Sequence, residues 1–233
     1  MYLLKYIAKS GICSRRKAAD LIKSGSVLVN DVVVANQFLE VGPDDVVTYK
    51  GKVVKPEAHV YVLLNKPKDY LTTCSDERGR KTVMELIRDA SDHRLYPVGR
   101  LDRMTTGLLL FTNDGELAQK LSHPSSNIGK VYRVLIDRPL KSYDYKKLLD
   151  GLELEDGFIK VDSIKYTDSR DRRDVSVEIH SGRYRIVRRM FYFLGYKVEK
   201  LDRVGYAGLS LKSLKRGEWR FLTKEEVNRL NAL

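Results

Sequence analysis

The sequence is poor in the residues that build metal centres and disulfide frameworks. It has two cysteines in 233 residues, Cys13 and Cys74, and they do not stand at a metal-ligand spacing. This pattern argues against both a disulfide-stapled scaffold and a zinc site. A glycine-rich nucleotide-binding loop is also missing, so we expect the protein to use neither a metal nor an organic cofactor.

Long apolar runs are missing as well. The start, MYLLKYIAKSG, is too short and too charged for a signal peptide, and no stretch approaches the length of a membrane helix. A hydrophobic content of 42% nevertheless allows a sizeable core. We therefore expect a soluble, cytoplasmic protein, monomeric and without a membrane partner.

Acidic residues are outnumbered. The chain has 43 lysines and arginines against 31 aspartates and glutamates, a formal net charge of +12. Such an excess favours a polyanionic partner, nucleic acid before an anionic membrane surface. A basic surface that only serves solubility would give the same composition.

The first 55 residues read as a unit. Residues 2–9 have apolar side chains at helical spacing, and Ser14 is a good N-cap for a second helix over residues 15–23. The segment VLVNDVVVA then predicts a tight hairpin with Asn30 and Asp31 in the turn, and VVTYKG predicts another strand.

Basic residues gather on these two predicted helices. Free backbone N–H groups and cations at the start of the second helix, SRRK, suit a phosphate. The alternative is a solvated helix face, but the cations cluster instead of alternating with acids. The residues predicted to dock RNA are Lys9, Arg15, Arg16, Lys17 and Lys23.

The segment GICSRRKAADLIKSGSVLVNDVVV resembles the S4 RNA-binding domain, and the resemblance covers residues 2 to about 55. It implies a small α/β domain that docks paired helices onto structured RNA. We therefore divide the chain into an S4-like domain at 1–55 and a second domain at 56–233, with residues 52–60 as the linker.

The second domain mixes strands and helices. Strands are expected at 61–65, 108–112, 130–136, 159–166 and 174–180, and helices at 83–89, 114–122, 142–150, 186–194 and 224–230. Strand–strand and strand–helix connections alternate without a fixed order. This favours an α+β fold with a mixed, mainly antiparallel sheet flanked by helices.

One loop carries a candidate catalytic group. In GRLDRMTTGLLLFTNDG, residues 99–115, Arg100 and Arg103 flank Asp102, and an apolar strand follows. A strand buried in the core holds the preceding loop rigidly, and the arginines would keep Asp102 ionised. A structural Asp–Arg ion pair at a strand start is the alternative interpretation, and the loop by itself favours that one.

This loop resembles the signature of the RsuA-like family of rRNA pseudouridine synthases, which act on small- and large-subunit RNA. The resemblance implies that Asp102 is the nucleophile. Segments 64–87, 129–136 and 181–195 resemble further motifs of that family in the same order, as does the C-terminal tail. Asp69, where the family often has glycine, and Ile186, where glutamine is usual, depart from the pattern.

The resemblance assigns roles to further residues. Tyr132 stacks on the target base, and its hydroxyl can relay a proton; Arg188 pairs with the catalytic aspartate. Taken from the residues alone, Tyr132 would be a half-buried strand tyrosine and Arg188 one phosphate contact among several. The residues expected to bind substrate are Arg100, Arg103, Thr105, Lys130, Arg185 and Arg189.

The implied reaction breaks the N1–C1′ bond of uridine, rotates the uracil and rejoins it through C5, so it consumes no cofactor. A carboxylate takes part covalently, at the sugar or at the base, and the target leaves its stack. The expected partner is ribosomal RNA, free or in an assembling subunit, with the large subunit preferred. The alternatives are a non-catalytic S4-type ribosome assembly factor and a synthase acting on tRNA.

Overall fold

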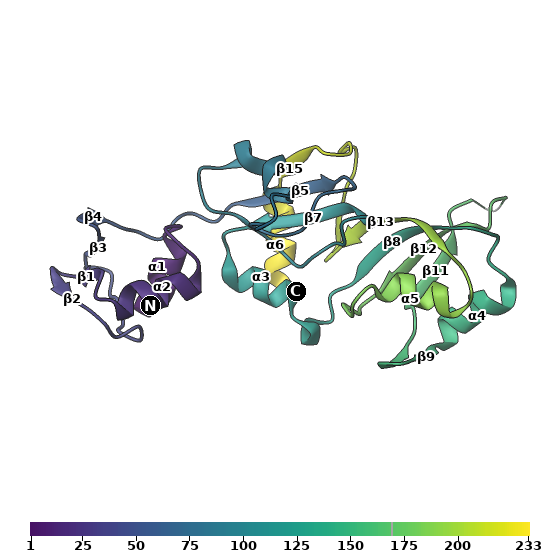
Figure 1. The fold of residues 1–233 in the computed structure, drawn as a ribbon, viewed down its shortest axis with the longest axis horizontal. Coiled ribbons are helices and arrows are strands. Elements are labelled where there is room, and N and C mark those ends of the chain that lie inside the picture. Colours follow the sequence, from purple (N-terminus) through teal and green to yellow (C-terminus); the bar gives the residue numbers. More distant parts are fainter. Residues whose placement is uncertain (169) are drawn as a thin grey trace. The chain divides into compact units, whose positions relative to one another are not determined.

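The computed structural model describes residues 1–168 and 170–233. Contacts group the chain into two compact units. The first comprises Met1–Val60, Ser91–Leu95 and Asn113–Gly115, and the second comprises Tyr61–Ala90, Tyr96–Thr112 and Glu116–Leu233. Figure 1 gives the element labels used below. Two short segments from later in the chain therefore belong to the first unit, together with the N-terminal segment Met1–Val60.

The first unit packs two helices on a small sheet. The helices are α1 (Leu3–Lys9) and α2 (Arg15–Lys23), and the strands β1 (Val27–Val29), β2 (Val32–Val33), β3 (Val47–Tyr49) and β4 (Lys52–Val53) pair in the order β2-β1-β3-β4. Ser14 accepts a hydrogen bond from the Lys17 backbone N–H and caps α2. Asn30 and Asp31 both have positive φ, which the two-residue hairpin turn requires. The helices and the hairpin predicted from the sequence are confirmed.

The second unit is built on a nine-stranded sheet. Its strands run β11-β12-β8-β13-β7-β5-β15, with β6 paired to β7 and β14 paired to β13. Their bounds are β5 (Tyr61–Lys66), β6 (Tyr96–Pro97), β7 (Thr106–Thr112), β8 (Lys130–Ile136), β11 (Ser163–Tyr166), β12 (Asp174–Ile179), β13 (Val198–Tyr206), β14 (Leu209–Ser210) and β15 (Trp219–Phe221). Among the described strands of this sheet, β13 and β7 form the one parallel pair.

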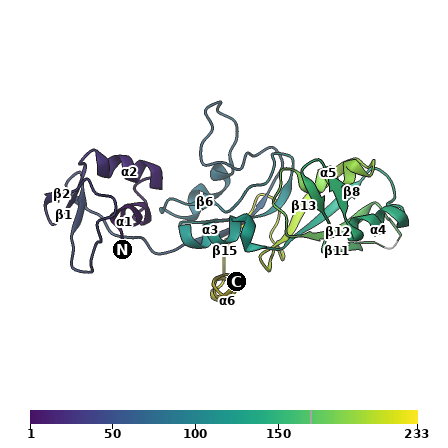
Figure 2. The ribbon, with the colours of Figure 1, turned by 90° about the horizontal axis from the view of Figure 1, so that it is seen from below.

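Helices cover this sheet at both ends. The helices α4 (Ser142–Asp150) and α5 (Ile186–Phe193) lie at the β8–β12–β11 end, and α3 (Gly115–Ser122) and α6 (Lys224–Ala232) lie near β7 and β5 (Figures 1 and 2). Two 3-10 helices, η1 (Val83–Ala90) and η2 (Pro124–Ser126), and a small hairpin of β9 (Leu152–Leu154) with β10 (Gly157–Ile159) complete the unit. This is the α+β architecture with a mixed, mainly antiparallel sheet that the sequence predicts.

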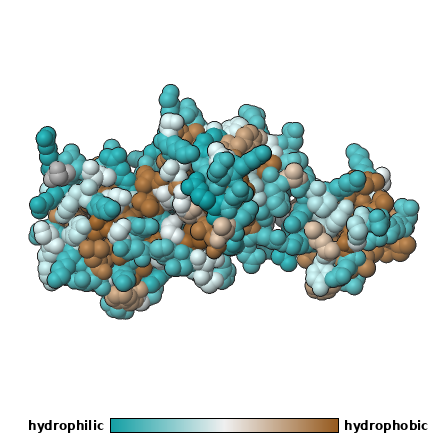
Figure 3. Space-filling view, turned by 180° about the vertical axis from the view of Figure 1, so that it is seen from behind, coloured by the Kyte–Doolittle hydropathy of each residue, from teal (hydrophilic) through white to brown (hydrophobic). Residues whose placement is uncertain are grey.

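Two hydrophobic clusters divide the larger core. One lies between α4, α5 and the strands β8, β11 and β12, and the other lies between α3, α6 and the strands β5 and β7. On the face of the molecule drawn in Figure 3, hydrophilic residues cover much of the surface and hydrophobic residues show in patches between them.

Three sequence expectations need correction. The single strand expected over 159–166 is two strands, β10 and β11, in different sheets, because the chain turns between them. The helix expected over 83–89 is the 3-10 helix η1. The longest strand, β13, was not predicted, although it lies in the middle of the sheet.

Candidate active site

Asp102 lies in the loop that leads into β7, and neighbouring groups hold this loop in place. The Thr72 hydroxyl donates to the Leu101 carbonyl oxygen at 2.8 Å, and the Thr105 N–H donates to the Asp102 carbonyl oxygen at 3.0 Å. β7 itself is buried along its whole length. The loop is therefore fixed at its start and at its end, as a reacting carboxylate requires.

A buried lysine ties the same loop together. Lys66, at the end of β5, is 0% exposed, and its ammonium group donates to the carbonyl oxygens of Pro67, Asp102, Arg103 and Thr105 at 2.9 to 3.2 Å. Burial lowers the pKa of Lys66 to about 8, and the nearby Asp102 and Asp69 carboxylates oppose that shift. Three of the four acceptors belong to the Asp102 loop, so the backbone there converges on one cation.

Asp69 closes the loop from the other side. Its φ of +70° lies in the left-handed region, where glycine is favoured and aspartate is tolerated. The Asp69 backbone N–H donates to the Arg103 carbonyl oxygen at 2.9 Å, and its carboxylate receives the Arg103 guanidinium at 2.8 Å. The residue that departs from the family pattern thus keeps the backbone shape that a glycine would adopt, and it adds an ion pair.

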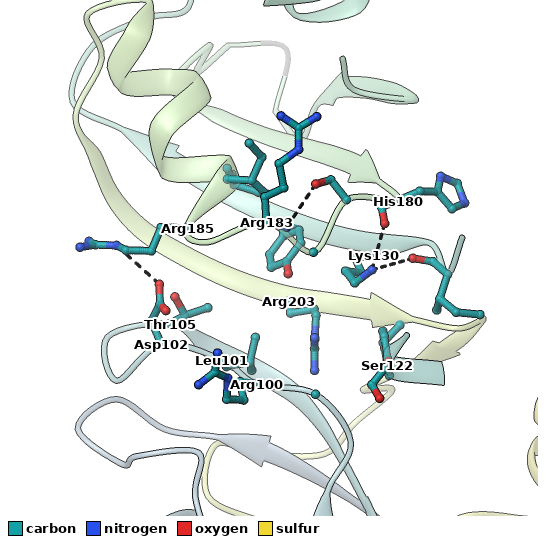
Figure 4. A pocket seen from close by; sticks show the side chains of 18 of the residues that line it. Arg100, Leu101, Asp102, Thr105, Ser122, Lys130, His180, Arg183, Arg185 and Arg203 are labelled. Carbon is teal, nitrogen blue, oxygen red and sulfur yellow. Dashed lines mark hydrogen bonds and ion pairs between the residues drawn. The ribbon is translucent and has the colours of Figure 1, made fainter. Parts of the chain in front are cut away.

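The Asp102 carboxylate borders a cavity of about 190 Å³. We call this cavity the Asp102 pocket; it lies where β7 and β13 run parallel, and Figure 4 shows its lining. The parallel approach is close, because a Cβ on Gly107 would overlap the Arg203 carbonyl oxygen. Its charged and aromatic lining residues include Arg100, Asp102, Lys130, Tyr132, Arg183, Arg185 and Arg203. One carboxylate therefore faces several cations.

The ion pair of Asp102 is made by a different arginine from the one expected. Arg185 Nε lies 3.7 Å from Asp102 Oδ2 (Figure 4), with φ of +46° at the start of α5. Arg188, expected in that pair, instead donates to the Val198 carbonyl oxygen at 3.0 Å. Burial and the charge of Arg185 lower the pKa of Arg188, whereas the Asp102 charge raises it. Arg185 stands in a left-handed conformation just before α5, whereas Arg188 lies within the helix.

Two further cations stand in the Asp102 pocket. The Lys130 ammonium donates to the carbonyl oxygens of Ile128 and His180, and burial, followed by the charge of Arg203, lowers its pKa to about 8. Arg203 on β13 is 2% exposed and donates from Nε to the Leu108 carbonyl oxygen. Within the described part of the chain, the Nη2 atom of Arg203 has no hydrogen-bond partner. A buried guanidinium with a free donor is suited to bind an acceptor that enters the pocket.

The pocket also holds a hydroxyl group and an aromatic ring. Thr105 is 2% exposed, and among the described residues its Oγ1 has no hydrogen-bond partner. Tyr132 on β8 is half-buried, packs against the larger hydrophobic cluster and faces Arg203 across the strand pair. The structure thus brings Asp102, Thr105, Lys130, Tyr132 and Arg185 together around one cavity.

Three further predicted substrate-binding arginines differ from one another in their surroundings. Arg100 is exposed and lines the Asp102 pocket, while Arg103 lines an adjoining cavity that Asp102 also borders and pairs with Asp69. Arg189 makes a two-atom ion pair with Asp156 at 2.6 and 2.8 Å, which holds the pKa of Asp156 at about 2. Arg189 therefore lies outside the Asp102 pocket, and so does Arg188.

The predicted RNA-docking cations all lie on the two helices of the first unit. Arg15, Arg16 and Lys17 form the exposed first turn of α2, Lys23 is exposed at its end, and Lys9 is half-exposed at the end of α1. Their opposite helix faces carry the buried core residues. The cations are therefore grouped on the solvent side.

Among residues 1–168 and 170–233, no group of three or more histidine, cysteine, aspartate or glutamate side chains is arranged to hold a metal ion. Likewise, no helix in the described part of the chain is long and apolar enough to cross a membrane.

Comparisons with known proteins agree with this architecture. Residues 60–192 match the family model described as RNA pseudouridylate synthase, and residues 2–47 match the model of the S4 domain. The chain belongs to the RNA pseudouridylate synthase family and is an isomerase that acts on RNA, with an S4 domain at its N-terminus. The family resemblance drawn from the sequence is confirmed.

Individual relatives span the whole chain. It is 42% identical over 234 residues to the ribosomal large subunit pseudouridine synthase B of Bacillus subtilis, covering 99% of this chain and 96% of that protein. It is 41% identical over 229 residues to an uncharacterized RNA pseudouridine synthase of Aquifex aeolicus, covering 97% and 92%. A crystal structure of a pseudouridylate synthase matches with a TM-score of 0.69 at 28% identity, covering 99% of both chains.

Proposed function

We propose that this enzyme converts a uridine of large-subunit ribosomal RNA to pseudouridine, with Asp102 as the nucleophile. The observation that carries the proposal is the Asp102 carboxylate, which borders a cavity lined by cations and by Tyr132. The names of relatives in Bacillus subtilis and Buchnera aphidicola support the large subunit. The expected setting is the cytoplasm, where a monomer would act on free rRNA or on an assembling subunit.

The residues divide the chemistry as follows. The target uridine leaves its stack and enters the Asp102 pocket, where the Tyr132 ring offers a flat face to the uracil. The Asp102 carboxylate takes part covalently, at the sugar or at the base, while the N1–C1′ bond breaks and the C5–C1′ bond forms. C5 loses a proton and N1, freed from C1′, gains one, so the reaction balances; the Tyr132 hydroxyl is the candidate that relays the C5 proton.

The cations orient and stabilise charge. Arg185 holds the Asp102 carboxylate in the free enzyme, and Arg188 adds a second positive charge behind it. Thr105 Oγ1 and Arg203 Nη2, both buried and without a partner among the described residues, are suited to hydrogen-bond the polar edge of the uracil. Arg100, Lys130 and Arg183 provide further charge for the sugar–phosphate backbone.

Two substitutions at one position test the nucleophile. Asp102→Asn should keep the fold and the RNA affinity but abolish tritium release from 5-tritiated uridine in rRNA. Asp102→Glu should lose on the order of 100-fold in kcat, because an extra methylene displaces the carboxylate by about an ångström. Asp89→Asn, which changes a fully solvated aspartate on η1, is the matched control and should be as active as the wild type. Substantial release by Asp102→Asn would remove Asp102 from this role.

The target itself needs a separate measurement. Pseudouridines are mapped in rRNA and tRNA from cells with and without the gene, and a single site in the large-subunit rRNA should disappear without it. Loss of a site only in tRNA would favour the alternative substrate.

A further inference from the structure

A further cavity lies along α5, distinct from the Asp102 pocket and from the cavity that Arg103 lines. Its volume is about 520 Å³, within the range typical of small-molecule sites. We call it the α5 pocket. The lining residues used here are Tyr184, Arg185, Arg188, Arg189, Tyr192 and Lys197. The catalytic roles proposed above use neither tyrosine and give Lys197 and Arg189 no part.

The two tyrosines of the α5 pocket are unusually open to solvent. Tyr192 is 81% exposed and Tyr184 is 74% exposed. Covering a tyrosine ring is favourable, because it removes apolar surface from water. Unpaired bases stack on flat, exposed rings of this kind. The next residue, Phe193, is also more than half exposed, so the C-terminal end of α5 presents two exposed aromatic side chains.

The charges around the α5 pocket are mostly positive. Among its described lining residues four are basic and one, Asp137, is acidic. Arg189 is held and neutralised by Asp156, whereas Arg188 is held only through a backbone carbonyl and its Nε has no partner among the described residues. Exposed aromatic rings beside basic side chains such as Arg188 and Lys197 are the features of a single-stranded nucleic-acid site.

The α5 pocket adjoins the Asp102 pocket. Arg185 lines both cavities, and its guanidinium makes the ion pair with Asp102. Tyr184 also borders the adjoining cavity that Asp102 and Arg103 line. A nucleotide in the α5 pocket would therefore be separated from a uridine at Asp102 by a single side chain.

We propose that the α5 pocket binds an unpaired nucleotide that flanks the target uridine, with its base stacked on Tyr192 or Tyr184 and its phosphate near Arg188 and Lys197. The proposal rests on the assignment of Asp102 as the catalytic centre. It makes the α5 pocket a site that selects the sequence or the local structure around the target. Base flipping requires such flanking contacts, because the strand on either side of the flipped base must be held.

Enzyme kinetics on a large-subunit rRNA transcript labelled with 5-tritiated uridine test this proposal. Tyr192→Ala should raise KM about 5- to 150-fold, the range expected for the loss of one stacked base. Tyr192→Phe keeps the ring and should stay within about twofold of the wild type, since stacking does not need the hydroxyl. Tyr143→Ala removes a similarly exposed tyrosine from α4 that does not line the α5 pocket, and should leave KM unchanged.

The salt dependence separates stacking from charge. Tyr192→Ala should leave the slope of log Kd against log salt as in the wild type, while Lys197→Ala should make it shallower by about 0.7 to 0.9. Equal KM values for Tyr192→Ala, Tyr184→Ala and Tyr143→Ala, with an active wild type, would overturn the proposal.

A crosslinking experiment keeps the two proposals distinguishable. The same rRNA is transcribed with 4-thiouridine, crosslinked to the full-length enzyme by light, and the modified residues are identified by mass spectrometry. Crosslinks at Tyr184 or Tyr192 are expected. If the wild type forms no pseudouridine, the proposed function fails. The crosslinks then test the α5 pocket by themselves, and the absence of crosslinks at both tyrosines overturns the proposal that this pocket binds a nucleotide.

Discussion

Replacing Lys66 by methionine should change the pH dependence of stability in a defined way. The Lys66 ammonium is fully buried, and its pKa falls from 10.5 in the unfolded chain to about 8 in the folded protein. Between these two values the unfolded chain binds more protons, so the free energy of unfolding rises with pH. Below pH 8 the buried charge costs about 3 kcal/mol, and about 2.5 kcal/mol of this is recovered between pH 7 and pH 10.

Urea titrations of the full-length protein near pH 7 and near pH 10 measure this change in the free energy of unfolding of the larger unit. In the wild type the rise contains the contributions of Lys66 and Lys130, whereas Lys66→Met should lose the Lys66 part, about 2.5 kcal/mol. Lys68→Met, two residues away on the exposed surface, should keep the full rise. A variant with the wild-type pH dependence would refute the reasoning.

The same variant should also lose activity, because four backbone carbonyls lose the cation that gathers them. Three of these carbonyls belong to the Asp102 loop, so losing the cation would let the loop shift. A displacement of the reacting group by about an ångström can cost on the order of 100-fold in kcat. Tritium release at saturating rRNA measures this loss. Full kcat in Lys66→Met would show that the loop keeps its shape without the ammonium group.

Three further predictions concern other parts of the protein. Glu226 is buried against Arg220, which lowers its pKa to about 2, so its stabilising contribution is present above pH 4.5 and lost as pH falls toward 2; Glu226→Gln should lower the free energy of unfolding at pH 7 by about 2 to 3 kcal/mol, measured by urea titration. Replacing Arg15, Arg16 and Lys17 by alanine should raise Kd for rRNA with little change in kcat, and three lost phosphate contacts should make the slope of log K against log salt shallower by about 2 to 3; an unchanged slope together with a lower Tm would indicate a structural role instead. Chelator-treated, dialysed enzyme should remain fully active without added nucleotide or metal, and a metal requirement on RNA already folded in monovalent salt would contradict this.

Local sequence signals predict those helices, strands and turns whose bounds are set by residues close to them in the chain. The helices α2 and α4 and the strand β8 have the predicted bounds, because Ser14 caps α2, Gly151 follows α4 and the apolar side chains of β8 recur at regular spacing. The hairpin turn at Asn30 and Asp31 is equally local. The family resemblance supplied what local signals could not, namely that Asp102 and Tyr132 border one cavity; it named Arg188 as the partner of Asp102, and in the structure Arg185 makes that ion pair.

The features that the sequence did not predict depend on long-range burial of charge. β13 has charged residues through its length and two register irregularities against β8, so neither period is visible in it. Arg203 and Lys66 were not singled out in the sequence; they are 2% and 0% exposed, and backbone carbonyls from sequence-distant parts of the chain accept their hydrogen bonds. Only Lys66 has a signal in the sequence, because it ends a strand that is otherwise mostly apolar, whereas Arg203 lies among other charged residues of β13.

The parallel pairing of β7 with β13 divides the large sheet into two antiparallel blocks that meet along one seam. Asp102 comes from the block of β5 and β7, whereas Tyr132, Arg203 and Arg185 belong to the other block or to the helix packed on it. The catalytic distances are therefore a property of the seam. A substitution that widens the seam, such as Gly107→Ala, would lower the activity of the enzyme without altering a side chain that lines the Asp102 pocket. Sequence changes within one block that leave its edge at the seam in place would not have this effect.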